Sequence, residues 1–210
     1  MLFTDIVGST ELMQRLGDDR YHLLRRRHME LLSEQITAHG GDEVKSEGDA
    51  LMAVFVSAVD AIGCGVAMQR AIHRHHAQHD ESEQLPLRVG MDAGEPIREG
   101  NDYHGTPVVI ASRLSNDADG GQIIVSQLVR RLVGSRGGFD FHDLAPRTLK
   151  GILETVPVCE VAWESFSDDE PATGTAHVPT PRLPLPATLV THQPETFVGR
   201  EAQLKELQAR

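Results

Sequence analysis

The sequence has little cysteine and no long hydrophobic stretch. Its only two cysteines, Cys64 and Cys159, stand in unrelated contexts without CxxC spacing. This argues against a disulfide framework or a zinc site and agrees with a reducing compartment. The longest apolar run, residues 50–59, is far shorter than the ~20 residues of a membrane-spanning helix, and no signal peptide opens the chain. We therefore expect a cytoplasmic protein that does not engage a membrane.

Positive charge is also scarce. The 210 residues contain 20 Lys and Arg against 31 Asp and Glu, which gives a formal net charge of −11. Nucleic acids and anionic membranes bind to basic surfaces, so neither is expected as a partner. A local basic run, LRRRH at 24–28, lies within a helical pattern and is expected to be a solvated face.

Hydrophobic periodicity and turn signals predict the order strand, helix, strand, strand, helix, strand over residues 2–94. This order is typical of an α+β fold with a ferredoxin-like βαββαβ core, in which both helices cover one face of the sheet. The predicted core elements are a strand at 2–7, a helix at 17–41, two strands within 43–55 around a Gly48–Asp49 turn, a helix at 58–76 capped by Ser57, and a strand at 86–94. Additional helices and strands are predicted at 106–116, 122–126, 127–133, 139–144 and 157–163.

Composition changes after Trp163, where the core pattern ends. Residues 1–164 are expected to form the domain, and residues 165–186 a Pro-rich linker. Residues 187–210 resemble the start of a signalling ATPase domain, which we expect to be truncated because no GxxxxGK[ST] phosphate loop follows. A core strand that starts at residue 2 also predicts that the native chain begins earlier.

Two acidic residues stand beside predicted turns. Asp5 lies on a core strand just before a turn in which Gly8, Ser9 and Thr10 would let backbone N–H groups face an anion at a helix start. Asp49 follows Gly48 in a tight turn. If their strands are neighbours, the two carboxylates converge at one end of the sheet, where they would suit Mg²⁺ and a polyphosphate. The alternative is that Asp5 is a strand-end acid and Asp49 an ordinary turn residue.

Three stretches carry a family resemblance. FTDIVGST, VKSEGDALMAVF and DYHGTPVVIASR, in this order, resemble the catalytic domain of class III adenylate and guanylate cyclases across about residues 1–163. The resemblance implies the class III nucleotide cyclase fold. It also implies two metal ions, Mg²⁺ or Mn²⁺, held by the catalytic acids Asp5 and Asp49 and by the main-chain carbonyl of Ile6.

The same resemblance assigns the substrate-binding residues. Lys45 and Asp102 match the pair that selects the base, and Lys150 matches a lysine that contacts the triphosphate. Adenine has an acceptor at N1 and a donor at N6, which an ammonium and a carboxylate complement, so ATP is expected over GTP. Taken singly, Lys45 would be interpreted as a solvated strand lysine and Asp102 as a turn acid.

Arg113 matches the family's transition-state arginine, but the residue one helical turn before it departs from the pattern. The family places an asparagine there, and this sequence has Val109. A valine cannot donate a hydrogen bond, and the loss of one such donor typically costs ~10²–10³ in rate. Arg113 by itself would be interpreted as one half of a surface ion pair.

The family builds each site across a head-to-tail homodimer, so one chain would supply the metal acids and the other would supply Lys45, Asp102 and Arg113. We therefore expect a weakly active adenylate cyclase that converts ATP to 3′,5′-cyclic AMP and pyrophosphate in intracellular signalling. The alternative is a non-catalytic nucleotide-binding and dimerisation module that regulates an attached ATPase.

Two further sequence patterns are typical of other functions, namely diguanylate cyclase activity and metal binding by histidines. GGDEV at 40–44 nearly matches the signature of diguanylate cyclases, but here it spans a helix end and a strand start instead of a hairpin turn. His75 and His79 have the i, i+4 spacing of a metal-binding pair. No Cys or acidic motif accompanies them, so a solvated helix end is the preferred interpretation.

Overall fold

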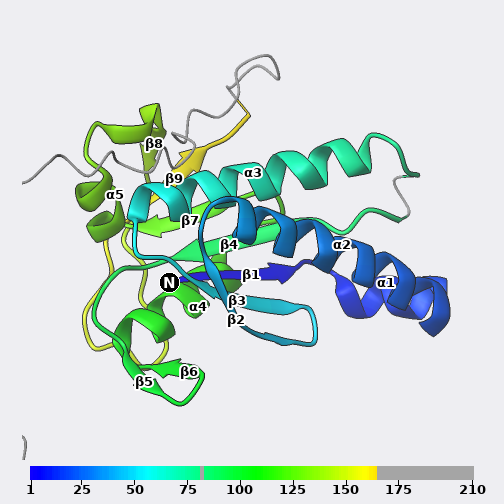
Figure 1. Cartoon of the computed structure of the whole chain (residues 1–210), viewed down its shortest axis with the longest axis horizontal. Helices are drawn as coiled ribbons and strands as arrows, with labels where there is room; N and C mark the ends of the chain where they lie inside the picture. Colours follow the sequence, from blue (N-terminus) through cyan, green and yellow to red (C-terminus); the bar gives the residue numbers. More distant parts are fainter. Residues whose placement is uncertain (81–82, 165–210) are drawn as a thin grey trace, which may run out of the picture. The chain divides into compact units, whose positions relative to one another are not determined.

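A mixed sheet of seven strands forms the centre of the fold (Figure 1). The computed structural model describes residues 1–80 and 83–164. The strand order is β2-β3-β1-β4-β7-β9-β8. The bounds of these strands are β1 Leu2–Ile6, β2 Asp42–Glu47, β3 Ala50–Val54, β4 Leu87–Met91, β7 Ile123–Ser126, β8 Asp140–Asp143 and β9 Val158–Ala162.

The first four strands confirm the predicted ferredoxin-like core. β1 lies between β3 and β4 and is antiparallel to both. β2 and β3 form a hairpin through Gly48, whose φ of 59° lies in the left-handed region that favours glycine. β7 continues the sheet in parallel with β4, and β9 and β8 extend it in antiparallel fashion. The α+β class is therefore as expected.

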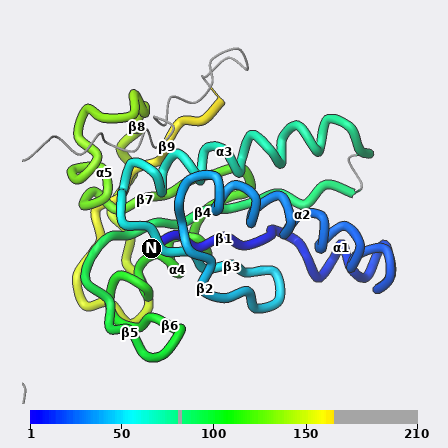
Figure 2. Tube along the Cα trace, in the orientation of Figure 1, coloured from blue at the N-terminus to red at the C-terminus, as the bar shows by residue number. Residues whose placement is uncertain are grey.

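Helices cover both faces of the sheet. α2 (Asp18–Ala38) and α3 (Ala58–His76) pack together on one face, as predicted, and α5 (Gln127–Val133) joins the same core (Figures 1 and 2). α4 (Thr106–Asp117) covers the other face. The alternation along β4 shows this, because Gly65 of α3 meets Val89 and Met91, whereas Gly90 meets the backbone of α4.

Close packing of α4 depends on Gly90. A Cβ at this position would collide with backbone atoms of Ser115, Ala111 and Leu114. The absence of a side chain therefore lets α4 lie directly on the sheet, and it fixes the helix relative to β1 and β4.

Two short features were not predicted. The turn expected after Asp5 leads, at residues 7–8, into a short helix that was not predicted as a separate element, α1 (Ser9–Leu16), whose apolar residue Leu12 packs beside Tyr21. Residues 97–104 form a two-stranded hairpin of β5 (Ile97–Glu99) and β6 (Asp102–His104). No element was predicted between residues 94 and 106, and Asp102, which taken singly was interpreted as a turn acid, starts a strand.

The described residues all belong to one structural unit. The predicted linker at 165–186 and the predicted ATPase start at 187–210 lie outside the described residues. Across residues 1–80 and 83–164, none of the helices combines the length and the apolar character needed to cross a lipid bilayer.

Candidate active site

The sheet brings the two predicted metal acids to one end. Thr4 of β1 lies opposite Leu51 of β3, so Asp5 comes level with the turn that carries Asp49. Both side chains are about one-fifth exposed, at 21% and 22%. The predicted convergence of Asp5 and Asp49 thus agrees with the strand register.

Asp5 is paired with an arginine of the neighbouring strand. Arg88 is its direct partner in the register of β1 and β4. The Nε of Arg88 donates to Asp5 Oδ2 at 3.0 Å, and Nη2 donates to the same oxygen. Arg88 Nη1 also donates to the carbonyl of Asn116 at 2.9 Å, which connects the pair to the last turn of α4. Arg88 lies outside the three family motifs and was not predicted, although a lone arginine in an otherwise apolar strand was the available signal.

Asp49 is held by two residues one turn apart on α2. The hydroxyl of Tyr21 donates to Asp49 Oδ1 at 2.7 Å, and Arg25 Nε lies 3.2 Å from the same oxygen. Arg25 also donates to the carbonyl of Gly48. Burial, followed by the hydrogen bond to Asp49, raises the pKa of Tyr21 to about 12. The phenol is therefore a neutral donor at physiological pH.

This arrangement corrects the interpretation of the basic run 24–28 as a solvated face. Arg26 and Arg27 are exposed, but Arg25 turns toward Asp49 and His28 is buried in the core. Positions i and i+4 of a helix share a face, which places Arg25 beside Tyr21. Periodicity alone did not reveal this, because the partner of Arg25 lies on a distant hairpin.

The carboxylates suit a divalent cation in one further respect. Each uses one oxygen for its protein partners, Oδ2 of Asp5 and Oδ1 of Asp49. Within residues 1–80 and 83–164, no hydrogen bond reaches the other oxygen of either carboxylate, and neither oxygen is sealed from solvent. Hard oxygen ligands of this kind are those that Mg²⁺ and Mn²⁺ prefer.

The other residues predicted to bind metal or phosphate lie at the end of β1 and at the start of α1. Ile6 ends β1 with its side chain buried, Gly8 precedes α1 with φ 70°, and Ser9 and Thr10 form the first turn of the helix. The backbone N–H groups of a helix start provide a partial positive charge. The metal role of Ile6 and the phosphate role of Gly8, Ser9 and Thr10 remain predictions.

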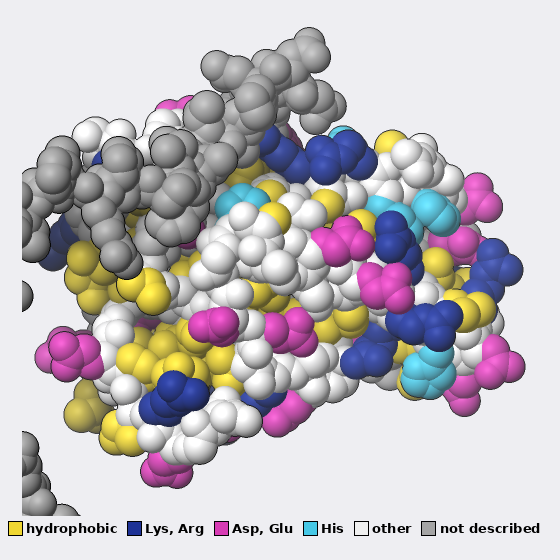
Figure 3. All heavy atoms as spheres, in the orientation of Figure 1, with side chains coloured by type: hydrophobic (Ala, Val, Ile, Leu, Met, Phe, Trp, Pro, Cys, Tyr) yellow, Lys and Arg dark blue, Asp and Glu magenta, His cyan; other side chains and the backbone are white. Residues whose placement is uncertain are grey.

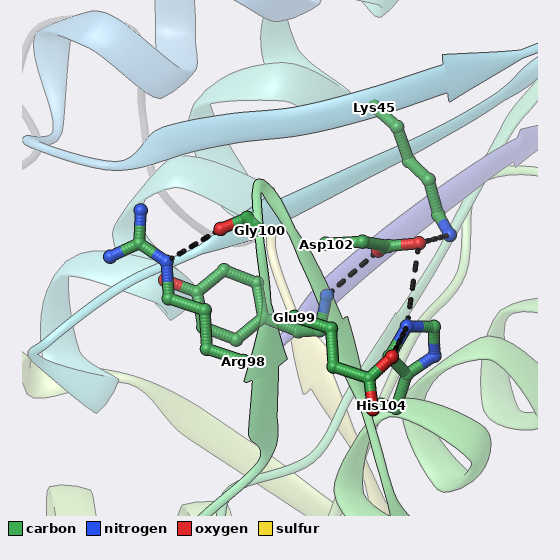
Figure 4. Close-up of polar contacts among 7 residues, drawn as sticks. Lys45, Arg98, Glu99, Gly100, Asp102 and His104 are labelled. Atoms are coloured by element: carbon green, nitrogen blue, oxygen red, sulfur yellow. Dashed lines mark hydrogen bonds and ion pairs between the residues drawn. The ribbon is translucent and has the colours of Figure 1, made fainter.

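Lys45 and Asp102 contact each other (Figure 4). Lys45 extends from β2 and its Nζ donates to Asp102 Oδ2 at 2.7 Å, while the other oxygen, Oδ1, accepts the backbone N–H of Tyr103 at 2.8 Å. His104 Nε2 approaches the same Oδ2 at 3.9 Å and Glu99 at 3.8 Å. The hydrogen bond from Lys45, and then that from Tyr103, lower the pKa of Asp102. The predicted base-selecting pair is thus assembled within one chain, as an ion pair.

The predicted catalytic arginine lies on the outer side of α4. Val109 and Arg113 are both exposed and lie four residues apart, so they share a face of the helix. Among the described residues, no hydrogen bond or ion pair reaches Arg113. Lys150 is exposed in the loop between β8 and β9. The structure does not bring Arg113 or Lys150 into contact with the acidic end of the same chain.

A hollow of mixed polarity lies at the opposite end of β1, where Asp42, Ser57 and Asp92 line it together with apolar side chains. It is lined by Met1, Val54, Phe55, Met91, Tyr103 and Leu132, among others. Hydrophobic side chains gather on this face between α5 and the β5–β6 hairpin (Figure 3). Because neither Asp5 nor Asp49 lines this hollow, we do not assign the metal and triphosphate site to it.

The structure also shows where the GGDEV stretch and the pair of His75 and His79 lie. GGDEV begins after α2 and runs into β2, so it occupies the positions that the sequence indicated and not the β2–β3 turn. The rings of His75 and His79 stack with centroids 4.0 Å apart, and His79 Nδ1 is bonded to the carbonyl of His75. In the part of the chain that the structure describes, no three His, Cys, Asp or Glu side chains form a group suited to a metal ion.

A comparison of this chain with solved structures shows which class of fold it has. The chain is similar to the crystal structure of an adenylate/guanylate cyclase/hydrolase from Silicibacter pomeroyi, with 29% identity and a TM-score of 0.70 over 76% of this chain and 93% of that one. It is also similar to the adenylyl cyclase CyaB from P. aeruginosa, with 25% identity and a TM-score of 0.67 over 80% of this chain and 94% of that one. The architecture is that of class III cyclase domains.

The sequence then gives the family. Residues 1–159 match the family described as the adenylate and guanylate cyclase catalytic domain. The chain belongs to this family. A putative adenylate cyclase 3 of Rhizobium meliloti (strain 1021) is 30% identical over 184 residues, which cover 88% of this chain. The chain spans about a third of that relative's length, and about a fifth of the length of the serine/threonine-protein kinase pkn2 of Myxococcus xanthus, which is also 30% identical over the matched part.

Proposed function

We propose that this domain converts ATP to 3′,5′-cyclic AMP and pyrophosphate, at a low rate, as part of intracellular signal transduction. The observation that carries the proposal is the contact between Lys45 Nζ and Asp102 Oδ2 at 2.7 Å in a domain of the cyclase family. Lys45 offers a donor for N1 of adenine and Asp102 an acceptor for N6. Guanine has the reverse pattern at these two atoms, so it would leave both side chains mismatched.

The reaction forms a bond between the ribose 3′ oxygen and the α-phosphorus, breaks the bond from that phosphorus to the bridging oxygen of pyrophosphate, and releases the 3′-hydroxyl proton. Two divalent cations would supply Lewis acidity at the 3′ oxygen and at the triphosphate. Asp5, Asp49 and the carbonyl of Ile6 would hold them. The start of α1, at Gly8, Ser9 and Thr10, would bind phosphate through backbone N–H groups.

The outer face of α4 would complete the site from a second copy of the chain. Arg113 is exposed and has no partner within the described residues, which suits a side chain that meets phosphate across an interface. In a head-to-tail homodimer, each site would combine Asp5 and Asp49 of one protomer with Lys45, Asp102 and Arg113 of its partner. Lys150 would add a contact to the triphosphate.

The low rate follows from Val109. It lies one turn before Arg113 on the same face, where it offers only methyl groups. One missing donor at developing charge corresponds to ~10²–10³ in rate. The same observation supports a second candidate, a nucleotide-binding and dimerisation module without catalysis, because metal and base binding do not depend on position 109.

The first experiment separates these two candidates. Purified protein would be incubated with ATP and Mn²⁺, and cyclic AMP would be measured beside the Asp5→Ala variant. We expect product well above that of the variant. Equal amounts from both proteins would contradict the enzyme and leave the binding module, which retention of ATP by equilibrium dialysis would then support.

The second experiment tests the shared site. Asp5→Ala and Arg113→Ala homodimers are each expected to be inactive, because each breaks both sites. Mixing and re-equilibrating the two variants forms heterodimers with one intact site, which should restore about a quarter of wild-type activity. Absence of recovery, with heterodimers demonstrated by differently tagged chains, would contradict a composite site.

A further inference from the structure

The two carboxylates at the end of β1 differ in how firmly their arginines are held. Arg88 faces Asp5 in the strand register and is tied on its far side to the carbonyl of Asn116 in α4. Within the described residues, the polar contacts of Arg25 are confined to the β2–β3 turn, where it contacts Asp49 and the carbonyl of Gly48. Arg88 is thus part of the framework of the fold, whereas Arg25 joins a helix to a turn.

Arg25 can leave the turn at little cost to the core. Its side chain is 28% exposed and extends from the side of α2. Tyr21, which shares Asp49 Oδ1 with it, is by contrast 4% exposed and packs with Ile6, Leu12 and Leu85. If Arg25 moves away, Tyr21 still donates to Asp49, so the carboxylate keeps its orientation.

A guanidinium beside Asp49 opposes a second cation on the same carboxylate. Its Nε lies 3.2 Å from Oδ1, so a divalent ion on Oδ2 would lie within several ångströms of a positive charge. Repulsion between charges of +1 and +2 at ~5 Å amounts to about a tenfold effect on affinity even at the dielectric constant of water. Tyr21 is neutral and carries no such penalty.

We propose that Arg25 is a displaceable counter-ion of Asp49, which holds the β2–β3 turn against α2 when no metal is bound and which a divalent cation must displace. This inference rests on the proposed function, because it takes Asp49 as a metal ligand. Arg25 is then a positioning residue that sets the metal concentration at which the site fills.

The test measures Mn²⁺ binding without nucleotide, by the loss of the free Mn²⁺ signal in electron paramagnetic resonance. Arg25→Gln should bind Mn²⁺ about tenfold more tightly than wild type, because the repulsion is gone. Arg25→Lys keeps the charge and should bind nearly as wild type. Arg26→Gln is the matched control, because it removes the same charge from an exposed position of the same helix and should leave affinity unchanged.

A thermal measurement distinguishes this role from ordinary stabilisation. Without metal, Arg25→Gln should melt below wild type because the turn loses its ion pair. At saturating Mn²⁺ the difference should disappear, since wild type has then lost that pair too. A difference that persists unchanged would indicate a purely structural ion pair and would overturn the proposal.

The outcomes also separate this inference from the proposed function. If Asp49→Asn weakens Mn²⁺ binding but Arg25→Gln equals wild type or binds more weakly, the counter-ion proposal is wrong and the metal site stands. If Mn²⁺ binding is the same in wild type, Asp5→Asn and Asp49→Asn, the metal site itself is wrong, and both proposals fail with it.

Discussion

At the acidic end of β1, each carboxylate already has an arginine of its own chain, whereas on the outer face of α4 the side chain of Arg113 has no partner within the described residues. The Lys45–Asp102 pair belongs with the first group, since both members are engaged with each other. Groups proposed to bind the base and the metal are therefore arranged before any ligand arrives. Arg113, the group proposed to contact the transition state, is not held in place by a partner within the described residues.

This contrast has an energetic meaning. Side chains that the free protein already holds in place can bind a ligand at a small entropic cost. Only interactions that strengthen in the transition state raise the rate of the chemical step. Substitutions at the two regions should therefore act on different quantities, namely selectivity and affinity at one and turnover at the other.

The largest effect is expected for Arg113→Ala. Removal of a cationic donor from the developing phosphate charge should lower cyclic AMP formation by ~10³. Because Arg113 is exposed and has no partner within the described residues, the melting temperature should not change. Arg131→Ala, on the exposed side of α5, is the control and should keep full activity. Equal losses of cyclic AMP formation in both variants would contradict a catalytic role for Arg113 on α4.

Val109→Asn should act in the opposite direction on the same face. An asparagine one turn before Arg113 adds the missing donor and should raise turnover by up to ~10². Val109→Ala changes the side chain without adding a donor and should leave turnover near wild type. Steady-state assays at saturating ATP would show the difference as a change in kcat, and an equal gain in both variants would attribute it to side-chain volume.

Lys45→Met should change selectivity more than turnover. The variant loses the donor for adenine N1, so the ratio of kcat/KM for ATP over GTP should fall about tenfold. Arg113→Ala serves as the contrast here, because it should lower both substrates equally and preserve the ratio. A ratio unaffected by Lys45→Met would contradict base recognition by this pair.

The smallest effect concerns the ionisation of Asp102. Hydrogen bonds from Lys45 and then from Tyr103 lower its pKa below the ordinary value of 3.8. A lowered pKa means that the pair stabilises the fold above the ordinary pKa, and that this contribution is lost as pH falls through the folded-state value. In Lys45→Met, the pKa of Asp102 measured by carbon NMR should rise toward 3.8. An unchanged pKa would show that Lys45 does not hold the carboxylate in solution.

The core topology could be predicted from sequence because its signals are local and repeated. Apolar alternation, helical spacing and the Gly48 turn are all visible in short windows, and they predicted β1 to β4 with α2 and α3. α1 was not predicted as a separate helix because its eight residues, bounded by Gly8 and Gly17, are too few to show a clear helical period. β5 and β6 have three residues each, too few to show alternation.

The partners of the acidic residues could not be predicted for a different reason. Arg88 and Asp5 are 83 positions apart, and Arg25 meets Asp49 across a hairpin. Such contacts depend on register and on which side of a helix faces the sheet, neither of which is encoded in one segment. The basic run at 24–28 was therefore misinterpreted, because the partner of Arg25 lies on a distant hairpin.

Gly90 limits which substitutions the fold tolerates beneath α4. Since α4 rests directly on β4 at this glycine, any larger residue beneath the helix would push Val109 and Arg113 out of place together. Variation that tunes turnover while keeping the fold is thus confined to the solvent side of α4. Position 109 is such a place, where a single codon change could restore or silence chemistry without disturbing the sheet below.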